Sequence, residues 1–119
     1  MTPYKPLRIE MHAAFELALA AALMLLPYAV GLAPDAVVVG LATGFLLAGL
    51  AISGSEPSGR GGLPLSAHAV YDWALGIGLI GIAIVMGIVS GPAPLILFLA
   101  AGAVELTLIA STSYSAGRA

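Results

Sequence analysis

The sequence predicts an all-α integral membrane protein, a four-helix transmembrane bundle formed by one domain over residues 1–119. The chain is 61% hydrophobic and only 8% charged, whereas a soluble domain averages about 25% charged residues. Four apolar segments each approach the ~20 residues that a helix needs to cross a bilayer. The second pair of segments resembles the first. A water-soluble fold of this size could not cover so much apolar surface.

The elements follow from where apolar runs and helix-breaking residues alternate. The first span should end at Pro27, since proline disrupts a helix interior. The second is entered through Pro34, a favourable residue for a first helical turn. Between the second and third spans, residues 54–64 are rich in Gly, Pro and Ser and predict a loop. The four predicted spans are Ile9–Tyr28, Asp35–Ser53, Leu65–Val89 and Pro92–Thr112.

Two halves of the chain, about 9–54 and about 65–113, form an internal repeat. Short turns force each pair of spans to be antiparallel, so each half is a helical hairpin. His12 and His68 open the two halves, and Gly44 aligns with Gly102 in their second helices. Because two spans separate the copies, both hairpins point the same way, which makes this a parallel repeat.

Basic residues predict the orientation. Lys5, Arg8, Arg60 and Arg118 all lie before the first span, in the central loop or in the tail. The positive-inside rule therefore places both termini in the cytoplasm, in a multi-pass protein of the plasma (inner) membrane whose main partner is the lipid bilayer. With a net charge of −2, nucleic acid is not expected as a partner.

Small residues predict close contact between helices. Gly40 and Gly44 form a Gly-x-x-x-Gly pair, which lets transmembrane backbones approach. The pair serves packing inside the bundle or, as the alternative, the seam of a homo-oligomer. A protein with so little mass outside the membrane also fits an accessory subunit of a larger membrane complex.

Ionisable groups recur at the start of the first and third spans. His12 and Glu16 are four residues apart, as are His68 and Asp72, and this spacing puts each pair on one helix face. Glu105 in the fourth span falls at the same depth, roughly 10 Å inside the cytoplasmic boundary. Ionisable groups inside a bilayer are costly and usually functional. These five residues are the candidate site.

Four uses of this site remain open. His12, Glu16, His68, Asp72 and Glu105 offer nitrogen and oxygen ligands that suit Zn, Mn or Fe. His12 and His68 alone are candidate ligands of a haem. The acids and imidazoles could also relay protons or belong to the path of a translocated solute. Finally, each histidine could pair with an acid across the repeat and hold the two hairpins together, an arrangement that we call the interhelical lock.

Enzymatic chemistry has little support in the sequence. The chain has no cysteine, which excludes thiolate catalysis and cysteine-ligated metals. It also shows no nucleophile with a matching base and no glycine-rich phosphate loop. Trp73 and Tyr28 fall where aromatic residues line the two membrane interfaces, so we interpret both as structural. The sequence favours a non-enzymatic protein.

The chain resembles the SPW-repeat proteins, small bacterial membrane proteins built of two-helix repeats. The shared pattern is His-x-x-x-acid, an apolar run, a Pro-aromatic pair at a helix end, and Gly-x-x-Glu-Leu near the end of the closing hairpin. The matching residues are His12, Glu16, Pro27 and Tyr28, then His68, Asp72, Trp73, Gly102, Glu105 and Thr112. The signature Ser-Pro-Trp reads Leu26-Pro27-Tyr28 here, and the second half lacks the proline. The resemblance implies the two-hairpin membrane fold and carries no activity.

Overall fold

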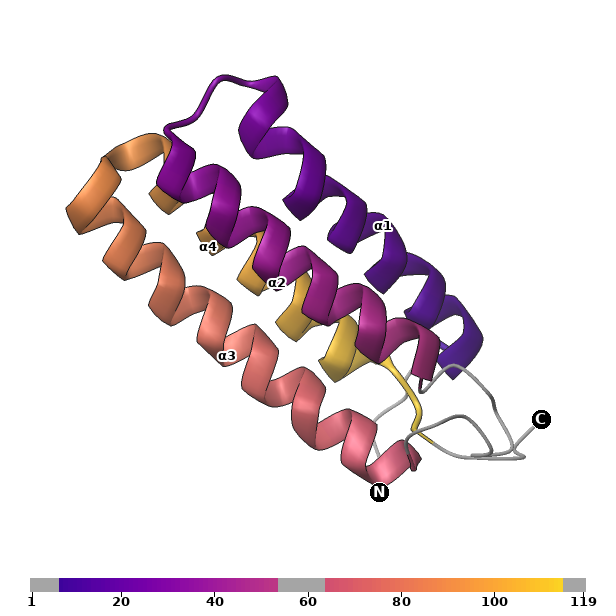
Figure 1. The fold of residues 1–119 in the computed structure, drawn as a ribbon. Helices are drawn as coiled ribbons and strands as arrows, with labels where there is room; N and C mark the ends of the chain where they lie inside the picture. Colours follow the sequence, from indigo (N-terminus) through magenta and orange to yellow (C-terminus); the bar gives the residue numbers. More distant parts are fainter. Residues whose placement is uncertain (1–6, 54–63, 115–119) are drawn as a thin grey trace.

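Four helices form the described part of the chain, in a computed structural model that describes residues 7–53 and 64–114. They are α1 (Ile9–Ala29), α2 (Pro34–Ser53), α3 (Leu65–Ser90) and α4 (Pro92–Ser111) (Figure 1). The prediction of an all-α four-helix bundle is confirmed, and each predicted boundary lies within one residue of the observed one. The predicted loop at 54–64 falls outside the described residues, apart from Pro64.

The helices are arranged in chain order around the bundle. Most contacts lie within two hairpins, α1 with α2 and α3 with α4, while α1–α4 and α2–α3 contacts join the hairpins. The starts of α1 and α3 lie beside the ends of α2 and α4 (Figure 1). We call this the cluster end and the opposite end the turn end. Because α1 and α3 are not neighbours in this order, they face each other diagonally across the bundle axis.

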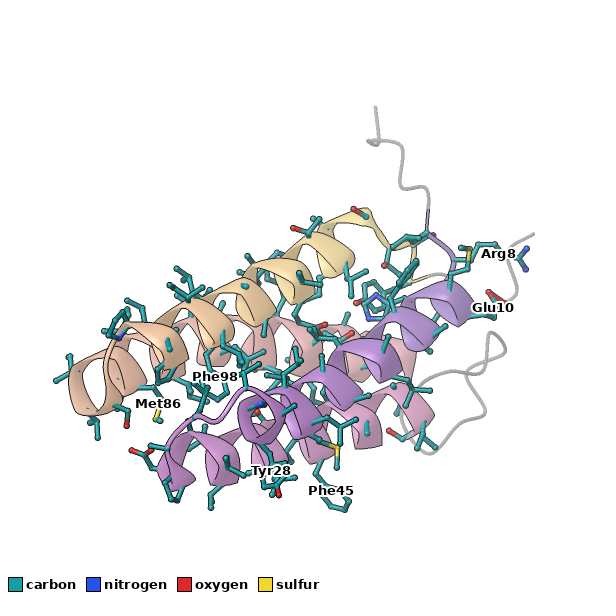
Figure 2. All side chains as sticks on the ribbon, turned by 90° about the horizontal axis from the view of Figure 1, so that it is seen from above. Arg8, Glu10, Tyr28, Phe45, Met86 and Phe98 are labelled. Atoms are coloured by element: carbon teal, nitrogen blue, oxygen red, sulfur yellow. The ribbon has the colours of Figure 1, made fainter. Side chains whose placement is uncertain are left out.

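The outer surface of the bundle is apolar. Each helix is long and apolar enough to cross a membrane, with a mean hydropathy of 1.7 to 2.3 over its most apolar window. Large side chains on the outside include Ile88, 81% exposed, and Phe45, 71% exposed, and Figure 2 shows Phe45 pointing away from the helices. Such a surface would be unfavourable in water. The chain is therefore a multi-pass membrane protein.

The core towards the turn end is tightly packed. Phe98, Leu23 and Leu79 are completely buried there. On the α1–α2 seam, a Cβ added to Gly44 would lie 2.7 Å from the carbonyl oxygen of Ala20, and one added to Gly40 would collide with the carbonyl of Leu23. Only glycine lets the two backbones come this close.

Proline 27 does not end the first helix, contrary to the sequence prediction. Helix α1 continues to Ala29, and Pro27 is buried inside it. Proline cannot bond the carbonyl four residues earlier, that of Leu23. This carbonyl faces α2 at Gly40. The neighbouring helix therefore allows the proline to lie within the span.

Turns and side-chain hydrogen bonds close the turn end. Gly91 separates α3 from α4 with a φ of 97°, a conformation that glycine adopts without strain. Ser90 donates a hydrogen bond to the carboxylate of Asp35, which also accepts from the backbone N–H of Ala36 at 2.8 Å. These contacts tie the end of α3 to the start of α2.

A short backbone bridge closes part of the cluster end. The N–H of Leu7 donates to the carbonyl of Ser111 at 2.9 Å, and the N–H of Ser113 donates to the carbonyl of Leu7 at 2.9 Å. The segment before α1 is thereby paired with the segment after α4. As a consequence, Thr112 and Tyr114 are held over the start of α1.

Candidate metal centre

Two histidines and two carboxylates form a closed ring on the bundle axis. Each histidine Nε2 faces a carboxylate one turn along its own helix: His12 to Glu16 at 3.1 Å, and His68 to Asp72 at 3.0 Å. Each also faces a carboxylate of the other helix: His12 to Asp72 at 2.9 Å, and His68 to Glu16 at 3.4 Å. We call these four residues the His/carboxylate ring.

The diagonal placement of α1 and α3 produces this ring. Both helices begin shortly before their histidine, and the spacing of four points each His–acid pair towards the bundle axis. All four side chains are completely buried, and one ligand atom of each lies within 4.8 Å of the others. Four of the five predicted site residues are thus brought together around one point.

Threonine 112 fixes the orientation of one imidazole. Its Oγ1 lies 2.8 Å from Nδ1 of His12. The hydroxyl proton is used in a hydrogen bond to the carbonyl of Leu108, so Nδ1–H of His12 must be the donor to Thr112. The other nitrogen, Nε2, is directed at the two carboxylates. It can therefore bind a metal through its lone pair or carry a second proton.

Tyrosine 114 covers the ring at the cluster end. Its hydroxyl donates a hydrogen bond to Oδ2 of Asp72 at 2.7 Å and lies 3.4 Å from Nε2 of His12. The phenol ring also contacts the His12 ring edge-on, with centroids 5.4 Å apart. Burial, together with the negative charge of Asp72, raises the pKa of Tyr114 above its ordinary value of 10.0. The phenol is therefore a hydrogen-bond donor at neutral pH.

Glutamate 105 lies beside the ring but outside the group of four. Its side chain is completely buried, and its Cγ lies 3.4 Å from the position of a Cβ built on Gly76, one turn beyond Asp72 in α3. Its charge interacts with those of Glu16 and Asp72. Among the described residues, neither of its carboxyl oxygens has a hydrogen-bond partner.

Other polar atoms of the ring also have free capacity. Oδ1 of Asp72 and Nδ1 of His68 are buried without a hydrogen-bond partner among the described residues. Native structures rarely leave several buried polar atoms unpaired in one place. Such a set of atoms, gathered around one point, is suited to a bound cation or to ordered water.

The residues predicted as structural lie elsewhere. Trp73 is 46% exposed and Tyr28 79% exposed, so both face outwards, while Gly40 and Gly44 face α1. Sequence reasoning did not assign Thr112 or Tyr114 to the site. Thr112 entered only through the SPW-repeat resemblance and as the end of the last predicted span. A further signal was that both residues fall at the level where the first and third spans begin.

Comparisons with known proteins identify no relative. No protein-family model matches the chain, nor does any curated protein or any solved structure. The function must therefore be inferred from the geometry of the His/carboxylate ring and from the apolar surface around it.

Proposed function

We propose that this protein is a small multi-pass membrane protein that binds one transition-metal ion in its His/carboxylate ring. The observation that carries the proposal is the convergence of four ligand atoms, two imidazole nitrogens and two carboxylate oxygens, within 4.8 Å of one another in a buried site. Imidazole with carboxylate suits Zn, Fe or Mn. A divalent ion would also neutralise Glu16 and Asp72 while both histidines stay neutral.

The hydrogen bond from His12 to Thr112 supports metal binding. Metal-ligating histidines almost always donate their other ring N–H to a fixed acceptor, which orients the ring and raises its basicity. Nδ1 of His12 does so at 2.8 Å, and its acceptor is itself held by the carbonyl of Leu108. Nε2 of His12 is thereby presented to the centre of the ring.

Two of the alternatives fit the geometry less well. A haem between His12 and His68 would need its porphyrin in the space that Glu16 and Asp72 occupy, because their oxygens lie 2.9 to 3.4 Å from the same Nε2 atoms. Proton or solute transport needs a polar path. Among the described residues, the buried ones between the ring and the turn end are apolar apart from Thr43, whose hydroxyl bonds the carbonyl of Val39 in its own helix. We therefore propose neither.

The test is metal analysis of the purified full-length protein in detergent or nanodiscs. After incubation with Zn²⁺, Mn²⁺ or Fe²⁺ and desalting, the wild type should retain one equivalent of at least one of these metals. The double variant His12→Ala/His68→Ala should retain none. Thr107→Val is the matched control, since Thr107 is exposed and bonds only its own helix, at the carbonyl of Ala103. A wild type that retains no more metal than the double variant would refute the proposal.

The interhelical lock is the second candidate function. With both imidazoles protonated, the same ring is a neutral set of alternating charges that joins α1 to α3, and its distances of 2.9 to 3.4 Å suit ion pairs. Melting temperatures separate the two candidates. Metal binding to the folded state raises stability with metal concentration, whereas the lock predicts the same melting temperature with metal and with chelator.

We further propose that the cluster end faces the cytoplasm and that the chain belongs to the SPW-repeat proteins as a parallel repeat. The support is the distribution of Lys and Arg and the two matching His-x-x-x-acid motifs. The natural chain has no cysteine, so single cysteines can report the orientation. In intact cells an impermeant maleimide should label Ala33→Cys, in the exposed turn between α1 and α2, and not Ser58→Cys. The reverse labelling would contradict the proposed orientation.

A role as an accessory subunit or homo-oligomer also fits a protein of this size. Its apolar outer surface, with Phe45 and Ile88 exposed, can contact lipid or another membrane protein. Native mass spectrometry of the complex released from detergent micelles would show a protein mass above that of one 119-residue chain if either prediction holds.

A further inference from the structure

The identity of the metal can be narrowed from the separations within the His/carboxylate ring. With metal–ligand bonds of about 2.1 Å, neighbouring ligand atoms lie about 3.0 Å apart in an octahedral site and about 3.4 Å apart in a tetrahedral site. Oδ2 of Asp72 lies 2.9 Å from Nε2 of His12 and 3.0 Å from Nε2 of His68. Glu16 presents a different oxygen to each histidine, Oε2 at 3.1 Å from Nε2 of His12 and Oε1 at 3.4 Å from Nε2 of His68. Three of these separations are close to 3.0 Å. The ring is therefore closer to the spacing of an octahedral site.

Glu105 can supply one of the two ligands that an octahedral site would still need. It is the acid that approaches the ring from α4, it is completely buried, and both of its oxygens lack a hydrogen-bond partner among the described residues. It packs over Gly76, one turn deeper in the membrane than Asp72, while Tyr114 covers the ring from the cluster end. Glu105 and Tyr114 thus flank the ring on opposite sides.

The preferred number of ligands also distinguishes between metals. The two imidazoles and the carboxylates of Glu16, Asp72 and Glu105 offer five ligand groups. Zinc favours four ligands in a tetrahedron, while manganese accepts oxygen ligands in an octahedron.

We propose that Glu105 is an additional oxygen ligand that makes the centre select manganese or iron over zinc. This inference rests on the proposed metal-binding function and names the residue that determines its specificity. Glu16 and Asp72 hold a metal with the two histidines in any case. Glu105 adds the ligand that a tetrahedral zinc ion would leave unused.

The second hairpin differs from the first at this position, and the difference provides the test variant. In the alignment of the repeats Leu47 of α2 corresponds to Glu105 of α4, and Leu47 is also completely buried. Glu105→Leu therefore removes the proposed ligand and introduces a side chain that the same level of the bundle already accommodates. Glu105→Gln keeps the shape and removes the charge, and Thr107→Val is the control on the same helix.

The experiment measures the Kd of Mn²⁺, Fe²⁺ and Zn²⁺ by competition with a chelating indicator, for full-length protein in nanodiscs and without oxygen. Glu105→Leu should weaken Mn²⁺ and Fe²⁺ binding by 10-fold or more, roughly the effect of losing a supporting ligand, and Zn²⁺ binding by less than about 3-fold. The electron paramagnetic resonance spectrum of bound Mn²⁺ should change in both Glu105 variants and stay unchanged in Thr107→Val.

The possible results distinguish a failure of the proposed role of Glu105 from a failure of the proposed metal centre. Equal weakening of Mn²⁺ and Zn²⁺ binding, or unchanged binding of all three metals, would overturn the role of Glu105 while leaving the metal centre in place. A wild type that binds none of the three metals would instead refute the centre itself. If Glu105→Leu does not fold, the spectrum of Mn²⁺ in Glu105→Gln decides, since an unchanged spectrum excludes Glu105 from the metal.

Discussion

The two ends of the bundle hold the same four helices together by different means. At the turn end, buried Phe98 and Leu23 fill the space between helices by shape alone, and Gly91 makes the tight connection. At the cluster end, completely buried ionisable side chains meet on the bundle axis. Inside a membrane an apolar side chain can be moved between core and lipid at little cost, but an unpaired charge cannot. The turn end is therefore specified by the packing of apolar side chains, whereas the cluster end is specified by the pairing of ionisable ones.

The same contrast separates α2 from α4. Both helices pass the level of the ring with a completely buried residue, Leu47 in α2 and Glu105 in α4. Only Glu105 adds an ionisable group to those of α1 and α3. The His/carboxylate ring therefore has one apolar side and one acidic side, and a cation in it would meet α4 rather than α2.

The largest expected effects come from one change at each end. Phe98→Ala should lower the free energy of unfolding by about 3–5 kcal/mol, because it leaves a cavity in the packed core, and should leave the metal content unchanged. His12→Ala/His68→Ala should abolish metal binding. Thermal melting and metal analysis of both variants test these two predictions. Loss of metal in a folded Phe98→Ala protein would show that the two ends are not independent.

The next effect concerns the close seam between α1 and α2. Gly44→Ala should destabilise the fold by about 1–3 kcal/mol through overpacking, since its Cβ would lie 2.7 Å from the carbonyl oxygen of Ala20. Gly49→Ala is the control, because a Cβ there meets nothing within 4 Å. Melting temperatures in nanodiscs measure both. Similar values for the two variants would mean that the seam is less close than the structure shows.

A smaller effect is expected from Thr112→Val. The hydroxyl that accepts from Nδ1 of His12 at 2.8 Å is lost, so metal affinity should fall about 10- to 100-fold, while the fold persists. The Kd of the bound metal measures this, with Thr107→Val as the control. An unchanged Kd would show that Thr112 serves the helix end alone.

The smallest effect is expected at Tyr114. Tyr114→Phe removes one hydrogen bond to Asp72 and should cost about 1 kcal/mol of stability without loss of metal. Because the pKa of the Tyr114 phenol is raised above 10.0, this group should not ionise just above pH 10. Tyrosinate absorbance at that pH should therefore be equal in the wild type and in Tyr114→Phe. A clearly larger signal in the wild type would contradict the burial of the Tyr114 phenol beside Asp72.

The fold could be predicted almost completely from the sequence, and the site only in part. Apolar runs of the length of a bilayer have few alternative structures, so the four spans were found to within one residue. The prediction that Pro27 ends the first helix was wrong, because the close approach of α2 at Gly40 allows the helix to continue. That approach is a tertiary contact which the local sequence does not encode.

The site shows the same limit. The spacing of four placed His12 with Glu16 and His68 with Asp72, and helix depth placed Glu105 at nearly the same level. Nothing local indicated that Thr112, 100 positions away, would contact His12. That contact depends on the backbone bridge between Leu7 and the segment after α4, which brings the two ends of the described chain together.

X-ray absorption spectroscopy of the metal-loaded protein tests the central claim most directly. The His/carboxylate ring predicts a shell of nitrogen and oxygen ligands with the outer scattering of two imidazoles, and His12→Ala/His68→Ala should bind no metal to measure. With Glu105 as a fifth protein ligand, Mn or Fe should show at least five ligands at about 2.1 Å. A metal bound without imidazole scattering, or a protein that takes up no metal at all, would contradict the account and leave the interhelical lock as the function of the ring.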